Sequence, residues 1–316
     1  MLKGLFNRNF KNNKFGLSGV IEALLLVALV AVILSTIQIV YVPEIMKQKE
    51  SDHLDTVENQ FSQLKSTIET QCMMGVIQQD QRVAYSPMSS IISLGTKKLP
   101  YFVTSNSFGG VLIKDREDTN SRIELEENPT GFLDGIDLCS VEYSFYTMYS
   151  SYDPKYILEG GGIILNQTGS SDETGEVMRV NPAITVENNS DSIKIYYTIP
   201  VFNCPEGKKN IQGLDEAYIR TNFTKAISYP ANPDAPGADI PYIHIYSDHL
   251  DAWYNCLMKD SEGLLWEYHN HDPQYINVEP PNEFDNFISI TPIEKMLRID
   301  FTIVTLGIQT GYGTVI

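Results

Sequence analysis

The stretch KFGLSGVIE, residues 14–22, decides how this chain is organised. A short basic segment ends at Gly16, and a long apolar run begins directly after it. No side chain is charged from Ala23 to Val42, and a helix of that length spans roughly 30 Å, the thickness of the hydrocarbon core of a bilayer. The sequence therefore predicts a helix that crosses a membrane and not the buried core helix of a soluble protein.

The charges beside this run set its expected orientation. Basic residues precede it, and no acidic residue comes before Glu22. Because positively charged flanks stay on the cytoplasmic side, we expect the N-terminus in the cytoplasm and everything after Val42 outside. The only cleavage-like sequence lies before the apolar run, whereas a secretory signal peptide is cut after it. We therefore expect the apolar helix to persist in the mature protein.

An amphipathic pattern follows the apolar run without an intervening loop. Its apolar residues recur at helical spacing and form one stripe: Leu54, Val57, Phe61, Leu64 and Ile68. The pattern predicts one helix over residues 17–71, about 80 Å long, with a bend at Pro43 and a stop at Gly75. The stripe either docks against the chain's own β-rich region or packs against neighbouring subunits, and we favour the first.

The composition excludes one class of partner. The formal net charge is −17, and removing residues 1–16, with their four basic and no acidic side chains, leaves −21. Nucleic-acid binding requires basic patches, so an acidic exterior argues against a nucleic-acid partner. It suits solubility in a salty medium or contact with cationic surfaces.

The remainder of the chain, the head, reads as rich in β-strands. Dense runs of β-branched and aromatic residues predict strands at residues 193–199, 242–246, 287–290 and 297–309. In the last run, Leu297, Ile299, Phe301 and Ile303 alternate with polar residues, as expected of a half-buried strand. One helix interrupts the strands, with Leu250, Trp253, Tyr254 and Leu257 on one face and Ser247 or Asp248 as its cap.

The fold class predicted from these patterns is α+β. A basic leader (residues 1–16) precedes a membrane or filament-core helix with its amphipathic extension (residues 17–74). A large antiparallel β-sandwich-like head (residues 75–316) follows, with a possible sub-boundary near residues 230–237, where proline and glycine are dense.

Cysteines and glycosylation sequons all lie on the predicted outer side. The cysteines, Cys72, Cys139, Cys204 and Cys256, allow three disulfide pairings among which the sequence does not choose, or they are buried free thiols. The sequons begin at Asn166, Asn188 and Asn222 and predict glycosylation, with unmodified loop asparagines as the alternative.

Catalysis finds little support in the sequence. It contains no GxSxG, HExxH or phosphate-binding glycine loop, so we expect no enzyme and no cofactor. Four histidines gather late in the chain, and two of them, His269 and His271, are spaced to share one face of a strand. They are weak candidates for metal ligands, because spacing fixes no third ligand, and we expect no bound metal.

The N-terminal motif also resembles a known family. Lys14-Phe15-Gly16 followed by Leu17-Ser18-Gly19-Val20-Ile21 is similar to the class III signal peptide of archaeal type IV pilin-like proteins. The resemblance covers about fifty residues of the chain. It implies cleavage between Gly16 and Leu17 by a prepilin peptidase that recognises Lys14, Phe15 and Ser18. It also implies a filament core built with other pilin-like subunits through this helix, with the heads outside.

Glu22 departs from the pattern of bacterial pilins. They place a glutamate fifth in the mature chain, whereas Glu22 would be the sixth residue here. A carboxylate in a membrane helix is costly, so we expect Glu22 to pair with the amine of Leu17 or with that of an adjacent subunit during assembly. The alternative is that it reaches the lipid headgroups.

Three functions are compatible with the sequence. The first is a type IV pilin-like structural subunit of an archaeal surface filament, minor or specialised because the head is large, which mediates assembly and surface contact such as adhesion. The second is a single-pass membrane protein that contacts the cell wall layer or a filament base without polymerising. The third is an anchored enzyme or solute-binding module. We favour the first.

Overall fold

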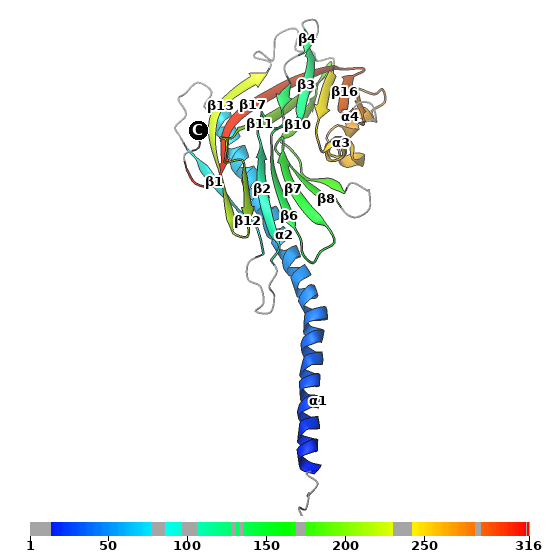
Figure 1. Cartoon of the computed structure of the whole chain (residues 1–316). Helices are drawn as coiled ribbons and strands as arrows, with labels where there is room; N and C mark the ends of the chain where they lie inside the picture. The colour runs from blue at the N-terminus through cyan, green and yellow to red at the C-terminus, as the bar shows by residue number, and fades with distance from the viewer. Residues whose placement is uncertain are drawn as a thin grey trace, which may run out of the picture. The chain divides into compact units, whose positions relative to one another are not determined.

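The computed structural model describes residues 14–77, 86–96, 106–127, 131–132, 135–168, 175–229, 242–281, 286–313 and 315 (Figure 1). For residues 14–18, 126–127, 131–132, 168 and 260 only the backbone is described. The predicted leader up to residue 13 and the predicted sub-boundary at residues 230–237 lie outside the described residues. The chain divides into two compact units, Met1–Lys49 and Glu50–Ile316, and we call the second the β domain.

The N-terminal helix is continuous, as predicted. It consists of α1 (Lys14–Thr36), a π-helical turn η1 (Ile37–Tyr41) and α2 (Val42–Ile77). At the end of η1 the Val42 N–H donates to the Ile37 carbonyl, five residues back. Pro43 has no N–H with which to continue the α-helical ladder, and the wider turn directly before it accommodates the proline within the helix.

Gly75 has a different role from the one predicted. Helix α2 runs through it to Ile77, so the predicted stop is wrong. A Cβ atom at Gly75 would lie 2.1 Å from the ring of Phe223. The glycine is therefore explained by the close approach of α2 to that ring and not by a helix end.

The described part of the β domain contains three sheets (Figure 1). In spatial order, sheet A consists of β1 (Met88–Ser93), β13 (Glu216–Tyr229), β17 (Met296–Thr310), β11 (Ser192–Asn203) and β10 (Ile184–Asn188). Sheet B consists of β12 (Asn210–Gly213), β2 (Phe108–Lys114), β6 (Ser140–Tyr146), β7 (Asp153–Glu159), β8 (Gly162–Thr168) and β9 (Glu176–Val180). Sheet C consists of β15 (Ile276–Glu279), β16 (Ile288–Pro292), β14 (Tyr242–Tyr246), β3 (Arg122–Glu127) and β4 (Gly131–Phe132), and β5 (Ile136–Asp137) also pairs with β3.

Pairing in these sheets is mostly antiparallel, as predicted. The exception is β11, which pairs with β17 in parallel from Ser192 opposite Met296 to Asn203 opposite Gly307. The α+β class, with one long apolar helix before a large and mainly antiparallel β domain, is confirmed. The sandwich-like arrangement stays a prediction.

The amphipathic stripe of α2 lies in the core of the β domain. All five residues of the stripe are buried, from Leu54 at 8% exposed to Phe61 at 0%. The Phe61 ring lies 6.3 Å from that of Tyr143 on β6 and 5.9 Å from that of Tyr156 on β7. In Figure 1 this part of α2 runs behind the strands of sheet B. Docking against the chain's own strands, the favoured alternative, is therefore confirmed.

The predicted strands and the predicted helix of the head are also found. Strand β14 has the predicted bounds, and β11, β16 and β17 contain nearly all of the residues predicted for them. Helix α3 (Leu250–Met258) buries Trp253 and Leu257, and short turns η2 (Asp260–Glu262) and α4 (Trp266–His269) follow it. Side chains of sheet A, sheet C and α3 line one small cavity of about 30 Å³.

Candidate functional site

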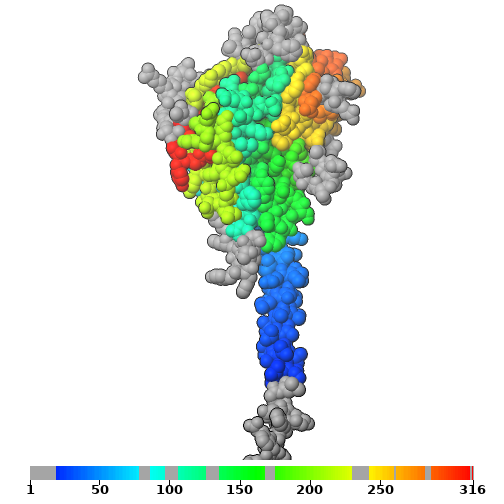
Figure 2. Space-filling model, in the orientation of Figure 1, coloured from blue at the N-terminus to red at the C-terminus, as the bar shows by residue number. Residues whose placement is uncertain are grey.

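The apolar part of the N-terminal helix is exposed along its whole length. Every residue from Gly19 to Tyr41 is exposed, and Glu22 is the only charged one among them. This stretch is the dark blue part of the helix in Figure 2. Of the described residues, only the helix Gly19–Ile77 is long and apolar enough to span a membrane. A helix that is apolar on every side needs lipid or other apolar helices around it.

The predicted cleavage site lies at the start of this helix. The backbone of Lys14, Phe15, Gly16, Leu17 and Ser18 is helical, and their side chains lie outside the described part of the structure. The structure therefore leaves the processing motif as a prediction. Glu22 is exposed on α1, and its predicted partner amine is also untested.

Glu50, the first residue of the β domain, has a buried carboxylate that binds other segments of this domain. Glu50 is 0% exposed and accepts hydrogen bonds from the turn between β6 and β7. Its Oε1 accepts from the Met148 N–H at 2.7 Å and the Tyr149 N–H at 3.2 Å, and its Oε2 from the Ser150 N–H and hydroxyl, both at 2.9 Å. The Ser107 hydroxyl donates to Oε1 as well. Glu50 thus ties α2 to two separate segments of the domain.

One turn further along α2, His53 is buried in a neutral form. The Tyr143 hydroxyl donates to the Leu94 carbonyl at 3.1 Å, so the His53 Nε2–H donates to that hydroxyl at 2.8 Å. Burial lowers the pKa of His53 to about 4. Neither Glu50 nor His53 is distinguishable in the sequence from the other polar residues of an amphipathic helix.

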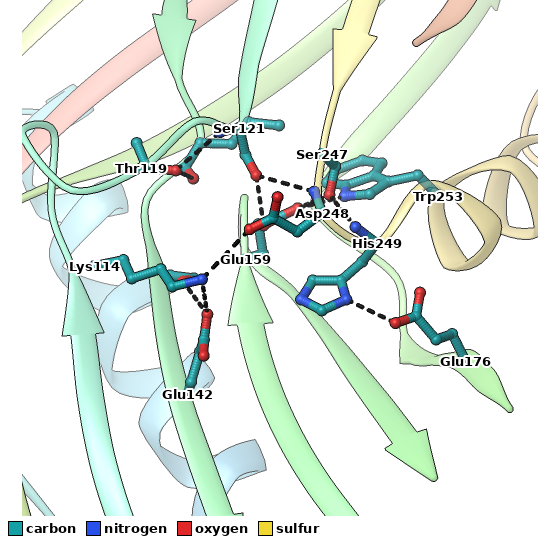
Figure 3. Close-up of polar contacts among 12 residues, drawn as sticks. Lys114, Thr119, Ser121, Glu142, Glu159, Glu176, Ser247, Asp248, His249 and Trp253 are labelled. Carbon is teal, nitrogen blue, oxygen red and sulfur yellow. Dashed lines mark hydrogen bonds and ion pairs between the residues drawn. The ribbon is translucent and has the colours of Figure 1, made fainter. Parts of the chain in front are cut away.

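A second buried carboxylate, Glu159 on β7, joins elements of sheets B and C (Figure 3). Its Oε1 accepts from the Ser247 hydroxyl at 2.5 Å and from the indole N–H of Trp253 at 2.8 Å. Its Oε2 accepts from the Ser121 hydroxyl at 3.1 Å. Burial raises the pKa of Glu159, although these donors and the charge of His249 oppose the shift. The folded protein therefore favours the protonated form of the Glu159 carboxyl more than water does.

Charged pairs surround this carboxylate at the surface (Figure 3). His249 Nδ1 lies 2.9 Å from Glu176, and the Lys114 ammonium lies 2.6 Å from Glu142 and 3.4 Å from Asp248. Burial lowers the pKa of His249, but the hydrogen bond with Glu176 and the nearby carboxylates outweigh burial and raise it overall.

Ser247 and His249, two residues apart in the chain, have different hydrogen-bond partners. The Ser247 hydroxyl donates to Glu159, while the His249 ring pairs with Glu176 on another strand (Figure 3). In a Ser-His catalytic pair the serine hydroxyl is hydrogen-bonded to the imidazole, and here it is bonded to a carboxylate instead. Ser247 and His249 therefore do not form such a pair.

The two metal candidates have separate structural partners. His269 lies at the end of α4 and not on a strand, so the predicted shared strand face is wrong. His269 Nδ1 accepts the Val278 N–H at 3.1 Å, and His271 stacks on Tyr275 with ring centroids 3.9 Å apart. Among the described residues, no three His, Cys, Asp or Glu side chains are grouped to hold a metal ion.

The predicted disulfides are not formed in the structure. Cys72 on α2, Cys139 before β6, Cys204 after β11 and Cys256 on α3 are all free thiols, the alternative that the sequence left open. Cys139 Sγ donates to the Phe202 carbonyl at 3.8 Å, and Cys256 Sγ donates to Asn181 at 3.5 Å. Burial raises the pKa of Cys72, Cys139 and Cys256 to about 12 and that of Cys204 to about 11.

The three sequon asparagines differ in accessibility. Asn166 on β8 is half-buried and donates to Glu176 at 2.6 Å. Asn222 on β13 is also half-buried and accepts the Ser86 N–H at 3.3 Å. Asn188, at the end of β10, is exposed. Glycosylation stays a prediction, and Asn188 offers the most accessible of the three side chains.

A groove of about 490 Å³ lies between the last turns of α2 and sheet A. Its walls include Ile68 and Met73 of α2 and Tyr196 and Thr198 of β11. Lys65, a buried cation at its edge, is already held by the Gly161 carbonyl at 2.6 Å and by Glu69 at 2.5 Å. The groove thus has the volume of a small-molecule site, but the ammonium group that could orient a solute is engaged.

Comparison of the chain with family models, with curated proteins and with solved structures finds no match.

Proposed function

We propose that this chain is a type IV pilin-like structural subunit, minor or specialised, of an archaeal surface filament. The observation that supports it most is the helix Gly19–Ile77, which is fully exposed over its apolar part while its later stripe is buried in the β domain. The same sequence element thus has one segment free for lipid or for other helices and one segment committed to the domain. The residues around Gly16, at the start of this helix, resemble a prepilin processing site.

The proposed topology follows from the charges around the helix. Basic residues before the apolar run hold the N-terminus in the cytoplasm, and the β domain lies outside. A prepilin peptidase removes residues 1–16, and the helix then moves from the membrane into a bundle with other pilin-like subunits.

In this proposal the β domain acts by surface contact. Its buried Glu159 joins β7 to α3 and to the segment after β14, and the chain is strongly acidic, with a net charge of −17. Sheets A and C, whose side chains share a cavity, form the sandwich-like part of this domain. Adhesion or decoration of the filament, with glycan at Asn188, fits such a surface.

Processing at Gly16 tests the proposal. In an archaeal host with a prepilin peptidase, we expect the mature protein to begin at Leu17 and the Gly16→Val variant to keep residues 1–16. The resemblance places Gly16 directly before the scissile bond, so a larger side chain at this position should prevent cleavage. Mass spectrometry of the N-terminal peptide measures both forms.

Gly19→Val is the matched control for this experiment. A side chain at Gly19 meets nothing within 4 Å, so this variant should be processed normally. Wild-type protein that keeps Met1 in the membrane would refute the prepilin proposal and favour the simple anchor.

The alternative function is a single-pass anchored protein that contacts the cell wall layer or a filament base without polymerising. It is favoured by the same exposed helix, because lipid alone could cover it. The two functions differ in what Glu22 does.

Glu22→Gln separates the two. If Glu22 pairs with the amine of a neighbouring subunit, the neutral variant should be exported and cleaved normally but be several-fold depleted in sheared filaments. Immunoblots of sheared and membrane fractions measure the ratio. Glu44→Gln, an exposed acid on α2, is the control and should leave the ratio unchanged. Equal incorporation of both variants would leave Glu22 no role in assembly.

A further inference from the structure

The turn between β6 and β7 carries large apolar side chains and no charge. Residues 146–152 read YTMYSSY, and Tyr146, Met148 and Tyr152 are 41%, 55% and 40% exposed. Phe108 on β2, itself 41% exposed, stacks on Tyr146 with ring centroids 4.8 Å apart. We call residues 146–152 together with Phe108 the aromatic turn. An apolar cluster of this kind on an acidic protein marks a contact surface.

Part of the backbone of the aromatic turn is hydrogen-bonded from inside the domain. Glu50 accepts the N–H groups of residues 148–150, and Asp153 accepts the Thr147 N–H at 2.9 Å. The Thr147 hydroxyl donates to the Tyr152 carbonyl at 3.0 Å. The N–H groups of residues 147–150 are thereby engaged while the large side chains are exposed. Such a turn can enter a poorly hydrated zone without leaving these donors unpaired.

The chain length limits how far Glu50, which holds this turn, can lie from the end of the apolar helix. Glu50, which holds the turn, comes eight residues after Val42, the last residue of the charge-free stretch. Eight residues cannot span more than about 28 Å even when fully extended. Whatever the orientation of the β domain, the aromatic turn stays within reach of the point where the chain leaves a membrane.

We propose that the aromatic turn contacts the headgroup region of the bilayer while the chain is anchored there. This inference rests on the membrane insertion proposed above. Tyrosine favours that region because its ring is apolar and its hydroxyl remains hydrated. Asp153 lies beside the turn, and the chain is acidic overall, so the contact is apolar and does not require anionic lipid. It should therefore be insensitive to salt.

The experiment uses the full chain in nanodiscs of zwitterionic phosphatidylcholine, with a fraction of the lipid carrying a nitroxide on its headgroup. Met148→Cys and Met296→Cys, each labelled with a small fluorophore, form a matched pair, because Met148 is 55% and Met296 50% exposed. The labelled unsubstituted chain corrects for reaction at Cys204, the half-buried native thiol. We expect several-fold stronger quenching at residue 148 than at residue 296, at low and at high salt alike.

A third label, at Leu29→Cys in α1, separates this inference from the proposed function. Quenching by nitroxide placed on the acyl chain at residue 29 reports insertion of the helix. If residue 29 is quenched while residues 148 and 296 are equally unquenched by headgroup nitroxide, the anchor stands and the inference is overturned. If residue 29 is not quenched, the anchor itself fails. If quenching at residue 148 changed with the number of chains per disc, the turn would be in contact with another copy of the chain. That result would also overturn the inference.

Discussion

Glu50→Ala is expected to destabilise the β domain by about 2–4 kcal/mol, because it removes a buried acceptor that serves three backbone N–H groups and two hydroxyls. The Ser107 hydroxyl, which is fully buried, would lose its acceptor, and the aromatic turn would lose the group that fixes it. For a domain of this size the midpoint of thermal unfolding should fall by roughly 4–16 °C. Far-UV circular dichroism of the full chain in detergent micelles measures the midpoint.

Asp55→Ala is the control for this change. Asp55 is an acid on the same helix whose side chain is exposed, so its removal should alter stability by no more than about 0.5 kcal/mol. Glu50→Gln keeps one acceptor oxygen and should fall between the two. If Glu50→Ala unfolded at the same temperature as Asp55→Ala, the carboxylate would not hold the turn in solution.

Two variants of Glu159 should separate the contributions of its shape and of its charge to the stability of the domain. Glu159→Ala leaves Ser121, Ser247 and the Trp253 indole N–H without their acceptor in a buried site, and we expect a loss of about 3–5 kcal/mol. Glu159→Gln keeps the acceptor for Ser247 and Trp253, and its amide can donate to the Ser121 oxygen. It should therefore fold nearly as well as the wild type.

The pH dependence of the stability of Glu159→Gln tests the direction of the pKa shift of Glu159. Because burial raises the pKa of Glu159 in the folded state, the folded chain prefers the protonated carboxyl more than the unfolded chain does. The contribution of this group to the free energy of unfolding is therefore largest at low pH and falls as pH rises above the ordinary value of 4.5. Glu159→Gln lacks this contribution. The stability of the variant relative to the wild type should rise with pH through that window, and a constant difference would contradict the inferred shift.

Local patterns in the sequence predicted the elements of this fold. The spacing from Leu54 to Ile68 predicted a helix with one buried stripe, and the run at residues 242–246 predicted a strand with its observed bounds. These signals depend only on residues close in sequence, because a helix repeats every 3.6 residues and a strand every two. They therefore do not depend on knowing the rest of the fold.

The contacts that hold the site could not be predicted in this way. Glu50 and Glu159 look in the sequence like any other acids, and their burial depends on donors about a hundred residues away along the chain. The parallel pairing of β11 with β17 has no local signature either, because alternation along a strand is the same for both directions of pairing. The stop predicted at Gly75 was wrong because two kinds of glycine look alike in the sequence. A glycine that makes room for a ring 148 positions later cannot be told from one that ends a helix.

The position of β17 in sheet A has a consequence for when this domain can fold. Strand β17 lies between β13 and β11, which do not pair with each other among the described residues (Figure 1). Without residues 296–310, sheet A is two separate pairs, β1 with β13 and β10 with β11. In the proposed topology the chain crosses the membrane from its N-terminal side, so β17 is the last of these strands to emerge. Translocation must therefore reach residue 310 before the sheet can close, and until then two unpaired strand edges are open to aggregation or to a chaperone.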